Sequence, residues 1–242
     1  DDDCIVLDVK TGSGSFMKTI EDSKTLAKMM VDIGKKAGKK MLAVITDMDR
    51  PLGNDIGNAL EVKEAVATLC GHGPEDLTEI CVALASNMLY LAGKGSYEEC
   101  ENNVKRVIAD GSALDTLAKM VKAQGGDERV IYNPELFEKA KYSHDVISDK
   151  EGYITHVDTE GYGIAALVLG AGRNTKEDKI DFTAGIILNK KTGDYVKKGE
   201  TIATLYTGNL KSVQDAETRL LSATVISDEK PAYKPIILGK VE

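Results

Sequence analysis

The chain has 242 residues, of which 42% are hydrophobic and 29% charged, a composition that excludes a disordered chain or a collagen-like fibre. Its 39 acidic residues outnumber its 31 Lys and Arg residues, and the formal net charge of -8 argues against a general nucleic-acid or membrane surface. No apolar run reaches the roughly 18 residues of a membrane helix, and no secretory leader is recognisable. We therefore expect a cytoplasmic globular protein.

Four cysteines stand at positions 4, 70, 81 and 100, with no CxxC pair and no nearby histidine to complete a zinc set. Cys4 lies in an apolar run and Cys81 on the apolar face of a predicted helix. These settings predict reduced thiols in the core. The sequence opens with three aspartates immediately before a predicted strand, which suggests an excised fragment or a processed product.

The first part of the sequence predicts a parallel α/β arrangement. A buried strand at residues 4–9 leads into a glycine loop, a helix follows over residues 21–36, and residues 41–46 form a second buried strand. This succession is the unit of a parallel sheet. Helical periodicity then predicts four helices, over residues 56–69, 75–92, 97–110 and 112–123. The second of these carries an apolar stripe that we expect in the core: Leu77, Ile80, Cys81, Leu84, Met88 and Leu91.

From about Tyr142 the pattern changes to short β-like segments separated by turns. Strands are predicted at residues 152–157, 164–169, 180–188, 201–206 and 236–241. The spacing of the later turns resembles half of a lipoyl or biotinyl carrier barrel, but no hairpin presents a modifiable lysine. The predicted class is α/β: a partial parallel-sheet domain with packed helices over residues 1–134, then a smaller, barrel-like α+β domain over residues 140–242 without a prosthetic group.

Two glycine loops are candidates for ligand binding. The loop at residues 10–16 follows a strand, and its glycines would let backbone N–H groups approach an anion, although neither Walker nor dinucleotide spacing is met. The loop at residues 170–178 is equally well explained as a turn. The histidines at positions 72, 144 and 156 lie in unrelated contexts, and no Ser/His/Asp or Cys/His set is apparent.

Glu61 and Glu64 are three residues apart and share one face of a predicted helix. They form either a solvated face or part of a hard-cation site, with oxygen atoms of the preceding loop completing the ligand shell. The residues alone leave both interpretations open.

Two longer strings resemble the pyrimidine-nucleoside phosphorylases, the thymidine phosphorylase family. They are residues 5–18, IVLDVKTGSGSFMK, and residues 47–65, DMDRPLGNDIGNALEVKEA. Residues 170–173, 179–181 and 185, with the turns that follow, resemble the C-terminal domain of that family. The resemblance runs in order along essentially the whole chain, and the GNALEVKE block is its most specific part.

The resemblance implies a pentosyltransferase whose partners are phosphate and a pyrimidine nucleoside. Such enzymes transfer the ribosyl or deoxyribosyl group of uridine or thymidine to phosphate, giving free base and pentose 1-phosphate, and work as homodimers. It also implies that the phosphate loop and the residues that grip the pyrimidine lie N-terminal to this sequence. The chain would then be the C-terminal half or slightly more of the enzyme, without catalytic residues and inactive alone.

The resemblance assigns four site residues. Phe16 matches an aromatic position that lines the base pocket. Leu52 and Asp55 match positions whose backbone carbonyls bind a structural potassium ion in some bacterial members, and Glu64 matches its carboxylate ligand. Asp55 replaces an expected small residue, which a carbonyl ligand tolerates. Glu64 lies about two and a half turns, or roughly 13 Å, into the predicted helix, so it can reach the loop only if the loop folds back.

Two other classes stay open. One is a non-catalytic binding or carrier-like module. The other is a related phosphoribosyltransferase, because anthranilate phosphoribosyltransferase shares a similar fold. That enzyme lacks the C-terminal barrel-like domain and uses a magnesium pyrophosphate site, so residues 142–242 argue against it.

Overall fold

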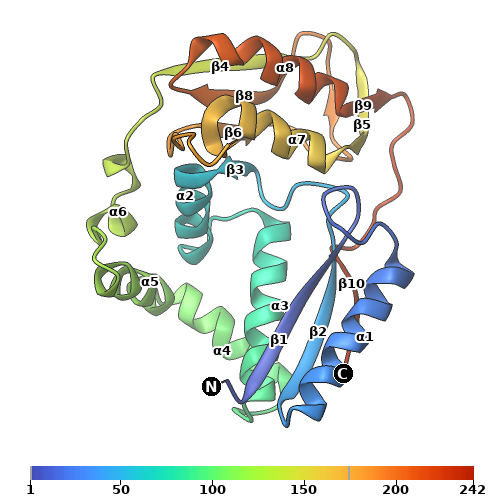
Figure 1. Ribbon diagram of the computed structural model, residues 1–242, viewed down its shortest axis with the longest axis vertical. Helices are drawn as coiled ribbons and strands as arrows, with labels where there is room; N and C mark the ends of the chain where they lie inside the picture. The colour runs from blue at the N-terminus through green and yellow to red at the C-terminus, as the bar shows by residue number, and fades with distance from the viewer. Residues whose placement is uncertain (1, 174) are drawn as a thin grey trace.

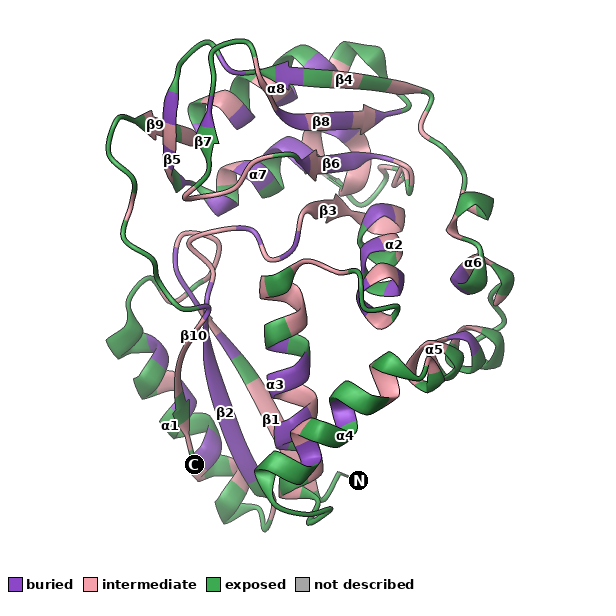
Figure 2. Ribbon diagram, turned by 180° about the vertical axis from the view of Figure 1, so that it is seen from behind, coloured by how far each residue is buried: buried purple, intermediate pink, exposed green. Residues whose placement is uncertain are grey.

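The first sheet of the computed structural model, which describes residues 2–173 and 175–242, is built around β2 (Lys40–Asp47) (Figure 1). β1 (Cys4–Thr11) pairs parallel with one edge of β2, and β10 (Ile237–Val241) pairs antiparallel with the other. Every residue of β2 after Lys40 is buried, as Figure 2 shows. This position explains why β2 reads as a continuous apolar run.

Helices cover both faces of this sheet. α1 (Ile20–Lys36) begins at Thr19, whose hydroxyl accepts a hydrogen bond from the Asp22 N–H, and it packs on alternate β2 residues. α3 (Glu75–Leu91) lies on the opposite side of the strands and contacts β1 and β2 (Figure 1). The strand, helix and strand succession predicted from the sequence is therefore confirmed.

The buried side of α3 differs from the predicted stripe. Ile80 is buried, but Cys81 and Met88 are exposed, and Ala83 and Asn87 take their place against the sheet. One side of the helix rests on β1 and β2, and the stripe extends beyond that contact. The cysteine prediction is also wrong in part: all four thiols are free, yet only Cys100 is buried, while the thiols at positions 70 and 81 are exposed.

A helical arc connects α3 to the second half of the chain (Figure 1). It consists of α4 (Tyr97–Ala109), α5 (Ser112–Ala123), α6 (Arg129–Tyr132) and a 3-10 turn at Pro134–Leu136. A small core of Val66, Ala118 and Ile131 fastens this arc to α2 (Asn58–Leu69). None of the helices within the described ranges has the combination of length and apolarity needed to cross a bilayer.

The second half contains two antiparallel sheets, with strand orders β3-β6-β8-β4 and β7-β5-β9. Their bounds are β3 (Asp55–Gly57), β4 (Tyr142–Ile147), β5 (Gly152–Val157), β6 (Gly185–Leu188), β7 (Tyr195–Val196), β8 (Thr201–Thr207) and β9 (Thr224–Ser227). The largest apolar core lies between these sheets and two helices, α7 (Thr159–Ala166) and α8 (Val213–Ser222). The predicted α/β class is confirmed, although the described strands close no barrel.

Two segments of the second half depart from the predictions. Residues 164–169, predicted as a strand, belong to α7 and to the π-helical turn at Leu167–Ala171. This segment is largely buried, and a short buried helix shows no amphipathic period that would distinguish it from a strand. In the predicted strand at residues 180–188, only Gly185–Leu188 is extended.

Two strand pairings cross the predicted domain boundary at residues 134–140. β10 returns from the end of the chain to β2, and β3 leaves the first half to pair with β6. Gly185 faces Gly57 in the second pairing, and a Cβ at Gly185 would lie 2.3 Å from the Ile56 carbonyl oxygen. The close approach of β3 and β6 therefore depends on glycine. The boundary itself stays a prediction.

Candidate functional site

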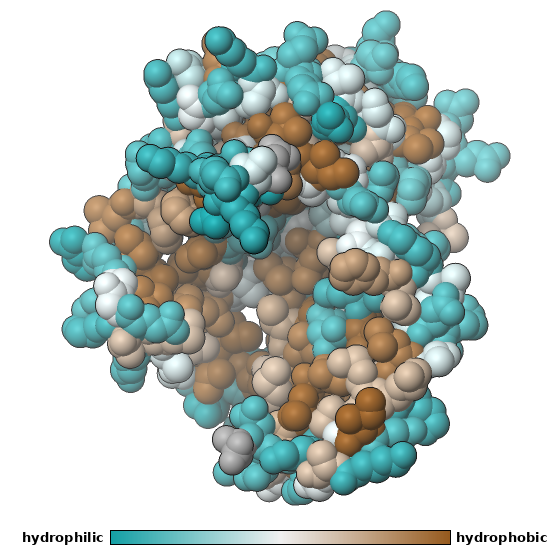
Figure 3. All heavy atoms as spheres, viewed as in Figure 1, coloured by the Kyte–Doolittle hydropathy of each residue, from teal (hydrophilic) through white to brown (hydrophobic). Residues whose placement is uncertain are grey.

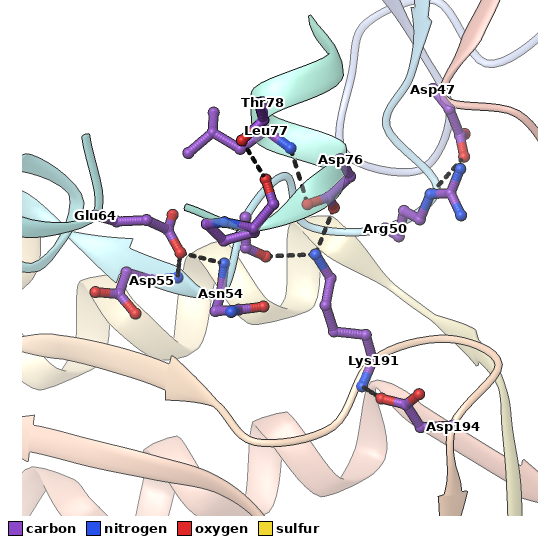
Figure 4. Close-up of polar contacts among 12 residues, drawn as sticks. Asp47, Arg50, Asn54, Asp55, Glu64, Asp76, Leu77, Thr78, Lys191 and Asp194 are labelled. Atoms are coloured by element: carbon purple, nitrogen blue, oxygen red, sulfur yellow. Dashed lines mark hydrogen bonds and ion pairs between the residues drawn. The ribbon is translucent and has the colours of Figure 1, made fainter. Parts of the chain in front are cut away.

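The loop between β2 and α2 folds back onto the side chain of Glu64. Oε1 of Glu64 accepts hydrogen bonds from the backbone N–H groups of Asn54, at 2.6 Å, and Asp55, at 3.2 Å (Figure 4). Glu64 is only 8% exposed. From the sequence, Glu64 could reach the loop only if the loop folded back along the helix. The structure shows this fold-back.

Gly53 makes the close contact between loop and carboxylate. Its φ is +71°, a left-handed conformation that favours glycine, and an added Cβ would lie 2.1 Å from Oε2 of Glu64. Among the described residues, none donates a hydrogen bond to Oε2. One oxygen of the carboxylate thus orders the loop, and the other keeps its capacity for a ligand.

The backbone of Asp55 is oriented by β-pairing. The carbonyl of Asn54 accepts the Leu188 N–H at 2.8 Å, and the next residue to bond across the ladder is Ile56, which faces Ile186. The N–H and C=O of the residue between them point away from β6. The N–H of Asp55 points to Glu64, so its carbonyl faces the same side.

Burial raises the pKa of the Asp55 and Glu64 carboxyl groups, and neighbouring negative charges add to its effect. The pKa of Asp55 is raised to about 7, first by burial and then by the negative charges of Glu64 and Glu61, with Lys63 acting in the opposite direction. Burial also raises the pKa of Glu64, against the lowering effect of its two backbone hydrogen bonds and of Lys191. A cation between these groups would relieve their repulsion.

A lysine and an aspartate that the sequence did not indicate complete this region. Nζ of Lys191 donates a hydrogen bond to the Gly53 carbonyl at 2.6 Å and a second one to Oδ2 of Asp76 (Figure 4). In the sequence, Lys191 is 138 residues away from Gly53 and 115 residues away from Asp76. No local pattern could have revealed contacts over such distances.

Phe16 stands apart from this loop and follows β1, where its side chain is 99% exposed. Its assignment to a base pocket stays a prediction. At the tip of the glycine loop that contains it, the backbone N–H groups already have acceptors within the chain. Those of residues 12–15 donate within the chain, to the carbonyls of Met17, Met48 and Gly12 and to the Asp49 carboxylate. The second glycine loop includes residue 174, which lies outside the described residues.

Elsewhere, a pocket of about 580 Å³ lies between α2, α5 and α7, and Figure 3 shows apolar side chains around the hollow there. Glu61 lines it, and its Oε1 accepts the Gly57 N–H at 3.0 Å. Within the described ranges, no three His, Cys, Asp or Glu residues are grouped to hold a metal ion. A cation at the Glu64 loop would therefore depend on backbone carbonyls, the ligands of a hard cation.

Comparisons with known proteins match two parts of the chain to family models and nearly its whole length to individual relatives. Residues 3–114 match the family described as "Glycosyl transferase family, a/b domain", and residues 153–227 match "Pyrimidine nucleoside phosphorylase C-terminal domain". Over 240 residues the chain is 48% identical to the pyrimidine-nucleoside phosphorylase of Geobacillus stearothermophilus. It is 46% identical to those of Staphylococcus epidermidis and Staphylococcus aureus.

The N-terminal match assigns residues 3–114 to the α/β domain of a glycosyl transferase family. With the C-terminal match and these identities, the chain belongs to the pyrimidine-nucleoside phosphorylase family. The alignments cover 99% of this chain and 55% of each relative, so the chain spans about half the length of the curated relatives it matches.

The contact between Gly53 and Glu64 can be tested with a matched pair of glycines. Gly53→Ala should destabilise the protein by roughly 3 kcal/mol, since the new methyl group meets Oε2 and the left-handed φ adds strain. Gly38→Ala, at φ +77° with nothing within 4 Å, should lose only about 1 kcal/mol. Urea unfolding measures both. Equal losses would mean that the carboxylate yields freely to the methyl group.

Asp55 should make stability depend on pH. Its pKa is about 7 in the folded protein and near the ordinary value of 3.8 when unfolded, so the folded state holds the extra proton between these pH values. The free energy of unfolding should therefore fall as pH rises from 4 to 7 in potassium-free buffer. Asp55→Asn should match the parent at pH 4 and exceed it by on the order of 1–2 kcal/mol at pH 8, after allowance for solvent screening.

Chemical denaturation across this pH range provides the measurement for Asp55. Asp149→Asn, at an exposed turn, controls for the loss of a surface carboxylate. If the two variants show the same pH profile, the perturbation of Asp55 does not contribute to stability.

Proposed function

We propose that this chain is the C-terminal half or slightly more of a pyrimidine-nucleoside phosphorylase. The whole protein would transfer the ribosyl or deoxyribosyl group of uridine or thymidine to phosphate, giving free base and pentose 1-phosphate. The observation that carries the proposal is the 48% identity, over 99% of this chain, to a relative that bears that name. We further propose that the whole protein is a cytoplasmic homodimer.

The chemistry is consistent with a chain that lacks a nucleophile of its own. Phosphorolysis needs phosphate held against an anomeric carbon with oxocarbenium character, and donors that stabilise the departing pyrimidine. We place the phosphate-binding and base-gripping groups in the part of the whole protein that this chain does not include. Phe16, with its fully exposed ring, would add an apolar contact to the pyrimidine.

A potassium ion is proposed at the loop that Glu64 organises. The donor set would be the carbonyls of Leu52 and Asp55 and the carboxylate of Glu64. Three features support the fit: Oε2 of Glu64 takes no hydrogen bond from a described residue, Gly53 lets the loop approach Oε2 closely, and Asp55 directs its carbonyl away from β6. When bound, the ion would supply positive charge, while the chain's own residues hold the loop in place.

Activity provides the first test. The chain alone should give negligible phosphorolysis of uridine or thymidine, since the phosphate-holding groups are absent, whereas the whole protein should be active. An absorbance assay for free uracil or thymine in the presence of phosphate distinguishes the two. Turnover by the purified chain would show that the catalytic groups have been assigned to the wrong half.

Potassium dependence provides the second test. In the whole protein, Glu64→Gln should raise the potassium concentration for half-maximal activity and thermal stabilisation by about tenfold or more, because the only carboxylate ligand becomes neutral. Glu61→Gln is the matched control on the same helix, and it keeps the oxygen that accepts the Gly57 N–H. If neither substitution changes the potassium response, Glu64 acts only as the structural anchor of the loop.

A further inference from the structure

Lys191 connects three parts of the chain at the edge of the Glu64 loop. It lies between β6 and β7, and its ammonium group donates to the Gly53 carbonyl at 2.6 Å and to the Asp76 carboxylate at the start of α3 (Figure 4). The side chains of Lys191 and Asp76 are 21% and 20% exposed. This pair is therefore more shielded from solvent than an ordinary surface ion pair.

Both ends of the connection are fixed by other hydrogen bonds. Oδ1 of Asp76 accepts the N–H of Leu77 at 2.9 Å, which holds the carboxylate at the beginning of α3. The backbone N–H of Lys191 donates to Asp194 at 2.8 Å, which holds the turn. The ammonium group thus occupies a defined position. It hydrogen-bonds the Gly53 carbonyl, whereas it acts on Glu64 only through its charge, which lowers the pKa of that carboxyl group.

The contact between Lys191 and the Gly53 carbonyl lies in the middle of the loop. Gly53 lies directly between Leu52 and Asn54 in the sequence, and Glu64 bonds the N–H groups on the side of Asn54 and Asp55. With Lys191 on the carbonyl of Gly53, the loop is held from both sides. The Gly53 carbonyl and the Asn54 N–H belong to one peptide group, which Lys191 and Glu64 therefore hold at its two ends, directly after the peptide group that carries the Leu52 carbonyl.

We propose that Lys191 is a positioning residue for the cation site, with Asp76 as its counter-ion. Lys191 fixes the direction of the Gly53 carbonyl, and the loop carbonyls of Leu52 and Asp55 then converge on Glu64. Asp76 neutralises the ammonium group and keeps it from approaching Glu64 as a competing internal cation. This inference rests on the proposed potassium site, and it adds a residue from the second half of the chain to those that position the ligands.

Lys190 offers a control at the neighbouring position. Its Nζ bonds Glu200 at 2.7 Å and the Tyr195 carbonyl at 3.2 Å, so it also forms an ion pair and a carbonyl contact. Both partners belong to the nearby β7 and β8 region. Lys190→Met therefore removes the same functional group without touching the loop.

The test is amide hydrogen exchange of residues 52–55 in the whole protein, with potassium chloride titrated against choline chloride. Lys191→Met should speed exchange of the Asn54 and Asp55 amides about tenfold without potassium, and should raise the potassium concentration for half-maximal protection about tenfold. Lys191→Arg, which keeps a cationic donor, should recover most of the protection, and Lys190→Met should behave like the parent.

The outcomes separate the inference from the function on which it rests. If potassium leaves exchange of the parent loop unchanged, the proposed potassium site is wrong, while the effect of Lys191→Met without potassium still measures the positioning. Equal exchange in Lys191→Met and Lys190→Met overturns the positioning role. If Lys191→Met speeds exchange throughout the chain, Asp76→Asn decides: faster exchange confined to residues 52–55 supports the inference, and a uniform increase overturns it.

Discussion

The buried carboxylate of Glu64 is the interaction on which the junction between the two halves depends. By accepting the N–H groups of Asn54 and Asp55, it turns the loop after β2 back along α2. The three residues of β3 are thereby presented to the edge of β6. Because buried backbone donors need partners, a single side chain both satisfies the loop and sets the strand that joins the sheets.

The charged groups around this loop fall into two sets: the Glu64 and Asp55 carboxyl groups, and the Lys191–Asp76 ion pair. Burial raises the pKa of both Glu64 and Asp55, and the negative charge of Glu64 raises that of Asp55 further, so these carboxyl groups favour positive charge nearby. Lys191 supplies some of it, but Asp76 holds its ammonium group at the Gly53 carbonyl. A cation proposed at this loop would meet backbone carbonyls and one carboxylate, ligands that suit a monovalent ion better than a transition metal.

Local patterns in the sequence predicted much of the first half and less of the second. β1, β2 and the long helices follow from apolar runs and helical periodicity. β3 is too short for a periodic signal, and residues 164–169, at the end of α7 and in the turn that follows, read as a strand because all of them are apolar. In the site, resemblance identified Glu64 and its loop, whereas Lys191 and Asp76 depend on contacts between distant segments that leave no local trace.

The return of β10 to β2 has a consequence for how the protein is made. The contact between Arg50 and the Lys234 carbonyl, just before β10, joins residues 184 positions apart. During synthesis, the second edge of β2 can be paired only after Ile237–Val241 has been made. An unpaired apolar strand edge is prone to association with other chains. The nascent protein therefore has a long interval of aggregation risk, and loss of Ile237–Val241 would make that exposure permanent.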